Sequence, residues 1–297
     1  MSGMRFYNFR EGDRSEYLAN YLVSGLGLVT PVPRQEDIGI DFYCSLADQE
    51  FGRLTFGFPY LLQVKSSSEK EITYGSLNKK NEWLRDDLLW LFRQELPLFI
   101  GIVYKNKMRI DIYNTSAFWF VHRENPNPNQ LIFKPRFDFN DKGDVGRPKK
   151  IKLENLPKNS GDGFKYEIDL GLPIISITNK DFDDKAKIAQ MKSALRAVIY
   201  IEQNNLVYKR LRLPYFNWIL KSDINKGIIP AWIYYGTGRE MTSALLRTIA
   251  PSLISLALNL KQCGDTVNLD IIKPLLKKLP KDMIYENLKK EHSDLFN

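Results

Sequence analysis

The chain has 297 residues, of which 43% are hydrophobic and 26% charged, a composition typical of a globular protein and not of a disordered or collagen-like chain. Two cysteines exclude a disulfide scaffold and a thiolate zinc site, and two histidines argue against a mechanism that needs several imidazoles. The net charge of +8 favours a polyanionic partner, and most of the excess lies in residues 181–297.

The sequence gives no indication of a membrane segment. The N-terminal segment MSGMRFYNFREGDRSE lacks the apolar run of a secretory signal. The longest apolar stretch, residues 249–260, is interrupted by Pro251 and is shorter than the ~20 residues that a bilayer-spanning helix needs. We therefore expect a cytoplasmic protein with no membrane association.

The first predicted element is a helix over residues 11–24. Apolar side chains such as Leu18 and Leu22 recur there at helical spacing, and Gly25 ends the pattern. Glu16 lies within this helix.

Two predicted strands follow, each with polar side chains on one face. Apolar and polar residues alternate over residues 38–46, which places Asp41 on the polar face of the first strand. In the second strand, residues 60–66, the same period of two places Gln63 and Lys65 on one face. An acidic side chain inside an apolar strand is costly to desolvate, so Asp41 needs a partner or a metal ion.

The next segments predict a helix, a hairpin and peripheral strands. Residues 81–96 carry apolar side chains on one helical face, and Pro97 ends this helix. Residues 98–104 and 108–114 are strand-like and are separated by a short polar turn, as in a hairpin. The polar, turn-rich segments that follow contain short strand-like pieces, the last at residues 172–177, which we interpret as peripheral strands and loops.

The pattern changes near residue 180. Beyond this point apolar residues recur at helical spacing in two stripes, over residues 188–199 and 241–253. We therefore predict an α/β domain in residues 1–180 and a mainly α-helical C-terminal domain in residues 181–297.

The order of the N-terminal elements resembles the PD-(D/E)XK, or restriction-endonuclease-like, superfamily. The matching segments are GDRSE in the first helix, EDIGIDFYC in the first strand and YLLQVKSSS in the second, within residues 8–115. They are most similar to the Mrr-type and Holliday-junction-resolvase-like branches and to nuclease-like domains of bacterial defence systems. The resemblance implies an α-β-β-β-α-β core in which a mixed sheet is flanked by helices.

The resemblance also implies an active site. Glu16 and Asp41 would hold Mg²⁺, with Mn²⁺ as an alternative ion, and Gln63 would add a carbonyl oxygen in place of the commoner Glu or Asp. Lys65 would orient water or offset charge at the phosphate. The implied function is that of an endonuclease hydrolysing DNA phosphodiester bonds, in defence against foreign DNA.

Other interpretations stay open. Asp41 could form a structural salt bridge with Lys65, and Glu16 could be a solvated helix residue. The alternative function is a catalytically silent nuclease-like module that binds nucleic acid or a partner protein. The helical domain could bind DNA or a defence-system partner protein, or form a homo-oligomer.

Several further residues are weaker candidates for contacts to the metal, the phosphate or nucleic acid. A polar loop explains Glu36 with Asp37, and a strand-end turn explains Ser66–Ser68. A packed edge explains His122 with Arg123. In the helical part, a basic cluster interleaved with aromatics suits phosphate contacts and base stacking, although the aromatics could equally be core. Its members are Lys209, Arg210, Arg212, Tyr208, Tyr215, Phe216 and Trp218.

Overall fold

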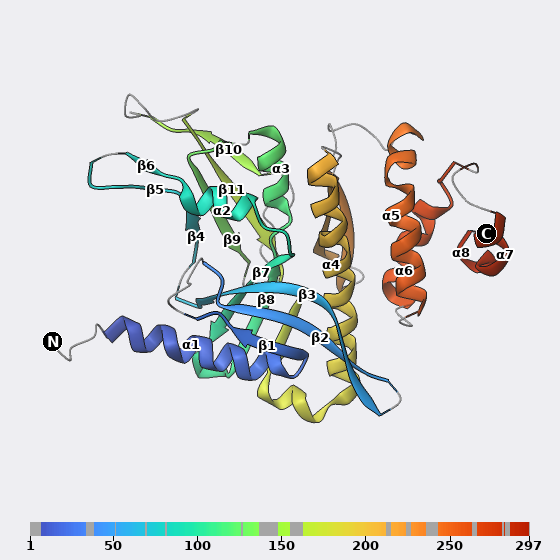
Figure 1. Ribbon diagram of the computed structural model, residues 1–297, viewed down its shortest axis with the longest axis horizontal. Coiled ribbons are helices and arrows are strands. Elements are labelled where there is room, and N and C mark those ends of the chain that lie inside the picture. The colour runs from blue at the N-terminus through green and yellow to red at the C-terminus, as the bar shows by residue number, and fades with distance from the viewer. Residues whose placement is uncertain are drawn as a thin grey trace.

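The computed structural model of the protein shows a mixed α/β structure with a six-stranded and a four-stranded sheet, and helices that share one hydrophobic core with them (Figure 1). The residues that the structure describes are 7–33, 39–50, 52–68, 70–80, 82–125, 127–136, 148–154, 163–211, 215–223, 227–235, 243–262, 266–280, 282 and 286–296. No helix within these ranges has the length and apolar character that a membrane-spanning helix requires.

The six-stranded sheet is mixed. Its strands, in spatial order, are β1 (Gly27–Pro31), β2 (Phe42–Glu50), β3 (Arg53–Ser66), β7 (Leu98–Tyr104), β8 (Arg109–Asn114) and β12 (Ile175–Thr178). Only the pair β3 and β7 is parallel among these neighbours, and every other neighbouring pair is antiparallel. A parallel pair needs a crossover connection, and the chain between β3 and β7 supplies it.

Side-chain alternation decides which face of β2 enters the core. Phe42 and Cys44 are almost fully buried, whereas Tyr43 between them is 45% exposed. The predicted division of this strand into an apolar and a polar face is therefore confirmed. The predicted strand over residues 60–66 and the predicted hairpin correspond to the end of β3 and to β7–β8.

The four-stranded sheet lies beside the first. Its spatial order is β10 (Lys149–Lys152), β11 (Phe164–Gly171), β9 (Gln130–Pro135) and β4 (Ile72–Tyr74). A small hairpin-like pair, β5 (Ser76–Leu77) and β6 (Trp83–Leu84), extends from it at the left of Figure 1. The hydroxyl of Tyr113 in β8 donates to the backbone oxygen of Arg136, which ties the two sheets together.

The helices cover these sheets. They are α1 (Tyr7–Ser24), α2 (Asp86–Phe92), α3 (Ala117–Glu124) and α4 (Lys185–Leu211), with short 3-10 turns η2 (Lys105–Lys107) and η3 (Asn179–Asp183). Helix α1 lies across the six-stranded sheet and buries Ala19, Leu22 and Val23 (Figure 1). The predicted first helix is thus present and begins earlier than expected.

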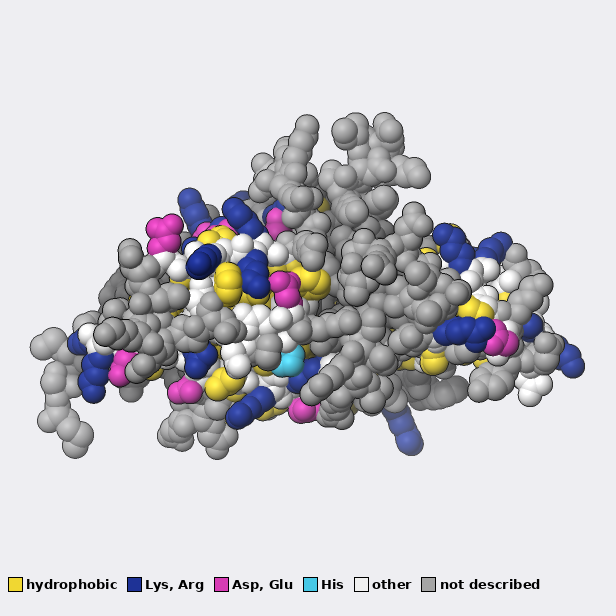
Figure 2. Space-filling model, turned by 90° about the horizontal axis from the view of Figure 1, so that it is seen from above, with side chains coloured by type: hydrophobic (Ala, Val, Ile, Leu, Met, Phe, Trp, Pro, Cys, Tyr) yellow, Lys and Arg dark blue, Asp and Glu magenta, His cyan; other side chains and the backbone are white. Residues whose placement is uncertain are grey.

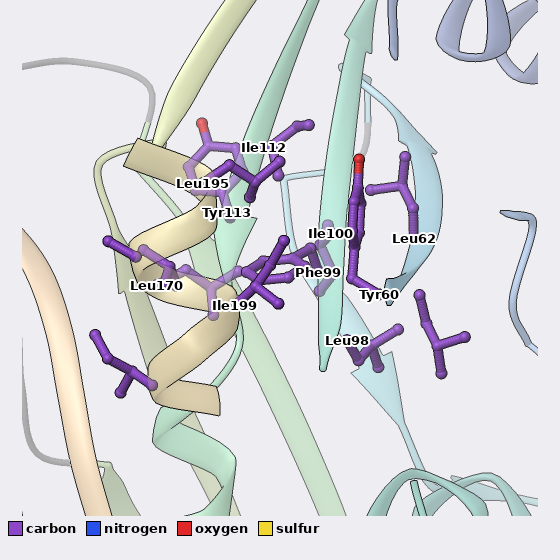
Figure 3. Close-up of a cluster of buried hydrophobic side chains, with 14 of the residues drawn as sticks. Tyr60, Leu62, Leu98, Phe99, Ile100, Ile112, Tyr113, Leu170, Leu195 and Ile199 are labelled. Carbon is purple, nitrogen blue, oxygen red and sulfur yellow. The ribbon is translucent and has the colours of Figure 1, made fainter. Parts of the chain in front are cut away.

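The long helix α4 packs on the first core. Figure 3 shows its Leu195 and Ile199 in the same buried cluster as Phe99 of β7 and Tyr113 of β8. Because α4 lies beyond residue 180, this packing joins the two predicted domains closely. The domain boundary itself stays a prediction.

The rest of the chain lies beyond α4 in Figure 1 or behind it. It contains the antiparallel strands β13 (Tyr215–Asp223) and β14 (Gly227–Tyr235) and the helices α5 (Ser243–Gln262), α6 (Thr266–Leu276), α7 (Glu286–Glu291) and α8 (Ser293–Phe296). The two strands were not predicted within this part, which was expected to be mainly α-helical. They fall in two aromatic and β-branched runs, YFNWIL and GIIPAWIYY, which suit a pleated surface.

The predicted helix over residues 81–96 is also corrected. Trp83 belongs to β6, and α2 covers only residues 86–92. Asp86 and Asp87 occupy its first turn, where acidic side chains stabilise the positive end of the helix dipole. The aromatic run FWFVHR forms most of α3, a helix that the sequence did not predict.

Candidate functional site

Asp41 lies directly opposite Gln63. The register pairs Phe42 with Leu62, and the Asp41 backbone N–H donates to the Leu62 oxygen at 3.1 Å, so the ladder extends by one residue before β2. Directly opposed residues of neighbouring strands point to the same face, as do residues two apart on one strand. The structure therefore brings Asp41, Gln63 and Lys65 together on one face of the sheet.

The carboxylate of Asp41 is held against β3. Its Oδ2 accepts a hydrogen bond from the backbone N–H of Val64 at 2.6 Å. Val64 separates Gln63 from Lys65, so this bond fixes the acidic group beside both side chains. A hydrogen bond to an ionised carboxylate is stronger than a neutral one and favours the charged form.

Gln63 is almost fully buried, with 7% of its surface exposed, and it has a definite partner. Its Oε1 accepts a hydrogen bond from the hydroxyl of Tyr74 in β4. Burial, and then the negative charges of Asp87 and Asp41, raise the pKa of Tyr74 far above its usual value. Tyr74 therefore keeps its proton and acts as a hydrogen-bond donor at neutral pH.

A pocket of about 470 Å³ opens beside these groups. It is lined by Gly39, Gln63, Lys65, Ile72, Thr73, Tyr74, Asp86, Asp87 and Trp90. Of these lining residues, only Gln63 and Lys65 were among the predicted site residues. A sequence signal for Asp86 and Asp87 existed, because paired aspartates suit a helix N-terminus.

Lys65 forms no ion pair with any residue in the described part of the chain. The structural salt bridge between Lys65 and Asp41, considered above as an alternative, is therefore not formed in this structure. Lys65 is half-buried and lines the pocket, which leaves its ammonium group available to an anionic ligand.

Glu16 is not among the described residues that line this pocket. It lies on α1 and is half-buried. Glu36 and Asp37 lie outside the described residues. The role of Glu16 as a metal ligand stays a prediction, as do the roles of Asp41, Gln63 and Lys65.

Two weaker candidates have structural partners. The ring of His122 packs edge-on against Phe92 at 4.7 Å, and its pKa is lowered by burial first and by the nearby Lys209 charge second. Lys209 lies 4.6 Å from the centre of the Trp119 ring and donates to the Gln94 backbone oxygen at 3.3 Å. Both contacts fit the packing of α3 and α4 better than a free nucleic-acid surface.

The remaining candidates give no further site. Ser67 N–H donates to the Val103 oxygen and the Ser68 hydroxyl donates to that of Ser66, as in a strand-end turn. The side chain of Arg123 lies outside the described residues. The same holds for every member of the C-terminal basic cluster except Lys209. On the face in Figure 2, the coloured basic and acidic side chains lie intermixed.

The donor set suits only a partly protein-held Mg²⁺ ion. Within the described ranges, no three Asp, Glu, His or Cys side chains lie close enough to hold a metal between them. Mg²⁺ is commonly bound through one or two carboxylates, with water and substrate phosphates as its other ligands. Asp41 fits such a site, whereas Gln63 has already committed its oxygen to Tyr74.

A second pocket, of about 540 Å³, lies at the opposite end of β2. Asp48, Lys185, Lys192 and Arg196 are among the residues that line it. The Arg196 guanidinium donates to both carboxylate oxygens of Asp48 at 2.6 Å, and Lys192 donates to the Ala47 backbone oxygen at 2.6 Å. These contacts fasten α4 to the β2–β3 hairpin.

No family model matches the chain, and searches of the curated proteins and of the solved structures gave no significant match.

Proposed function

We propose that the protein is a Mg²⁺-dependent endonuclease that hydrolyses phosphodiester bonds in DNA. The observation that carries the proposal is the placement of Asp41, Gln63 and Lys65 on one face, beside a pocket of about 470 Å³. The chain order α1-β1-β2-β3-α2-β7 supports it, because it follows the α-β-β-β-α-β order of the superfamily that the sequence resembles. The short strands β4, β5 and β6 are inserted between β3 and α2.

Each side chain has a distinct chemical task in this proposal. The Asp41 carboxylate would hold Mg²⁺, with Glu16 as the second carboxylate that the resemblance implies. The ion would supply charge at the phosphate and a more acidic bound water. Lys65 carries a positive charge and has no carboxylate partner among the described residues, so it would bind a phosphate oxygen and stabilise the charge that develops there.

A catalytically silent module that binds nucleic acid is the second candidate. It is favoured by the hydrogen bond between Tyr74 and Gln63, which occupies an oxygen that a metal would otherwise use. A role in defence against foreign DNA, and assembly with a second copy or a partner protein, are expectations from the resemblance alone.

A cleavage assay separates the two candidates. Purified protein is incubated with plasmid, linear duplex DNA, single-stranded DNA and RNA, in Mg²⁺, Mn²⁺ or EDTA. An endonuclease cuts DNA only with a divalent ion, and Lys65→Ala reduces the rate by roughly 100-fold, in the range of losses seen when one charge-stabilising donor is removed. Lys185→Ala, which removes an exposed lysine at the other pocket, is the matched control and keeps the wild-type rate.

Two outcomes would contradict the proposal. Cleavage that survives Lys65→Ala unchanged would show that the proposed site does not act on the phosphate. Wild-type protein that binds DNA and cuts no substrate with either ion would make the silent module the better account.

A further inference from the structure

The amide of Gln63 has one end engaged and one end available. Its oxygen accepts from the Tyr74 hydroxyl, whereas its nitrogen has no hydrogen bond to any described residue. Gln63 is almost fully buried, with 7% of its surface exposed, and it lines the pocket. An amide whose oxygen faces Tyr74 must direct its two N–H donors away from that hydroxyl.

Tyr74 is held too firmly to yield this bond easily. It pairs with Leu131 through β4 and β9, and its ring packs edge-on against Phe133 at 5.4 Å. The next residue, Gly75, has φ of +82°, and a Cβ there would lie 2.3 Å from the Asn129 backbone oxygen. The Gly75 N–H also donates to Asp87 at 2.8 Å, so the chain on both sides of the hydroxyl is fixed.

Using Gln63 as a metal ligand would break this arrangement. Its oxygen would have to leave Tyr74, and a buried hydroxyl proton would lose its acceptor, which is a costly change in a site that water reaches poorly. The oxygen of Gln63 is therefore better kept by Tyr74 than given to a cation.

Gln63 and Lys65 together present hydrogen-bond donors to the pocket. Both line it, they are two residues apart on β3, and Lys65 forms no ion pair in the described part of the chain. Adjacent neutral and cationic donors suit a phosphate, whose oxygens only accept. At the far wall the two oxygens of Asp87 accept from the N–H groups of Gly75 and Leu88, which hold this carboxylate in place.

We propose that Gln63 and Lys65 form a phosphate clamp, in which Tyr74 is the positioning residue that turns the Gln63 amide nitrogen toward a phosphate oxygen. Gln63 is then a donor to the substrate and not a ligand of the metal. The clamp deepens the proposed function and rests on it for the identity of the substrate, a phosphodiester. Free phosphate shares the same oxygen chemistry.

Two substitutions give opposite results for a clamp and for a metal ligand. Tyr74→Phe removes the hydroxyl that orients the amide, so a clamp loses three- to tenfold in DNA affinity measured in EDTA, and Mg²⁺ affinity does not rise. Gln63→Glu adds an acceptor where a donor is needed, so a clamp loses at least tenfold in DNA affinity, with Mg²⁺ affinity changed less than twofold. A metal ligand would instead gain Mg²⁺ affinity in both variants.

Two matched controls test whether loss of any buried hydroxyl, or addition of any negative charge, has the same effect. Tyr113→Phe deletes another buried hydroxyl, one that bonds the Arg136 oxygen, and Gln49→Glu adds the same charge at an exposed position on β2. Both keep wild-type DNA affinity. DNA binding is measured by fluorescence anisotropy, Mg²⁺ binding by calorimetry, and the side-chain amide of Gln63 by ¹⁵N NMR during titration with inorganic phosphate.

The outcomes distinguish failure of the clamp from failure of the proposed function. DNA binding that is unchanged in Gln63→Glu, with Mg²⁺ affinity raised tenfold or more, overturns the clamp and leaves an endonuclease in place. Wild-type protein that binds no DNA, but whose Gln63 amide shifts with phosphate, supports the clamp and overturns the DNA function. Neither DNA binding nor an amide shift overturns both.

Discussion

Strand β2 has an aspartate near each end, and the structure satisfies the two carboxylates differently. Asp48 is paired directly with Arg196, whereas Asp41 accepts from a backbone N–H and leaves Lys65 without a carboxylate partner in the described part of the chain. Seven residue steps of ~3.3 Å separate them, so the two ends lie roughly 23 Å apart. At one end Arg196 neutralises the aspartate within the fold, and at the other the Lys65 ammonium has no carboxylate partner among the described residues.

Pocket size does not make this distinction. The pocket at the Asp48 end holds about 540 Å³ and that beside Gln63 about 470 Å³, and each is lined by at least one aspartate and one lysine. What differs is whether a cation and a carboxylate already neutralise each other. A guanidinium held by two charge-assisted hydrogen bonds has less to offer an anion than an unpaired ammonium has.

The largest expected effect comes from replacing the two aspartates in turn. Asp41→Asn removes the negative charge of the proposed metal site at nearly constant size, so Mg²⁺-dependent DNA cleavage falls by roughly 100-fold or more. Asp48→Asn leaves the cleavage rate within about threefold of wild type, because that carboxylate serves the docking of α4. Initial rates of plasmid nicking measure both, and equal losses in the two variants would remove the distinction.

The second effect is on stability, where we expect substitution of Asp48 to cost more than substitution of Asp41. Asp48→Ala leaves the Arg196 side chain, only 12% exposed, without its counter-charge, so the free energy of unfolding falls by roughly 2 kcal/mol. Arg196→Met keeps much of the packing and leaves a carboxylate that is 41% exposed and can be hydrated, so its cost is nearer 1 kcal/mol.

Urea unfolding at pH 7 measures these changes. Asp41→Ala is the comparison variant, and we expect it to cost less than Asp48→Ala, because the Asp41 carboxylate accepts from the backbone N–H of Val64, whereas Asp48 neutralises the Arg196 guanidinium. A larger loss for Asp41→Ala would show that Asp41 is chiefly a structural residue.

The alternation of apolar and polar residues within strands was sufficient to predict which side chains share a face. A period of two on neighbouring antiparallel strands determines that Asp41, Gln63 and Lys65 share a face, and one register brings the first two opposite each other. The chemical roles assigned to them came from the resemblance and stay predictions.

The rest of the pocket depends on pairing that alternation does not encode. Tyr74 lies in a three-residue strand within the polar segment SSSEKEITYGSLNKK, and its partner Leu131 is far along the chain. The prediction of a helix over residues 81–96 was wrong because strand pairing was missed there as well: Trp83 pairs with Leu77 instead of continuing α2. Strand pairing, distant for Tyr74 and local for Trp83, overrides local periodicity at these positions.

A third carboxylate, Glu202 in α4, extends the comparison, because its described partners are neutral groups. It is 2% exposed, and the Asn205 amide donates to its Oε1 at 3.1 Å. Burial raises the pKa of Glu202 to about 8, although hydrogen bonds from Asn205, Ser116, Trp119 and Asn114 lower it in part. At pH 6 the folded protein therefore keeps this proton, while the unfolded chain, with a pKa near 4.5, releases it.

A pH-dependent effect on stability follows from that difference in proton binding. Between pH 5 and 8 the native state binds more protons than the unfolded state, so Glu202 makes the free energy of unfolding fall with rising pH, by about 1 kcal/mol per pH unit. The stabilisation is complete below about pH 4.5 and is lost as the pH rises through 8. Glu202→Gln keeps an oxygen for Asn205 and cannot ionise, so its unfolding free energy has a shallower pH slope, and its advantage over wild type grows toward pH 8. Urea unfolding at pH 5, 6, 7 and 8 measures the slope, with Asp48→Asn as the control that changes a carboxylate already paired with a cation; equal slopes in wild type and Glu202→Gln would show that Glu202 is ionised in the fold.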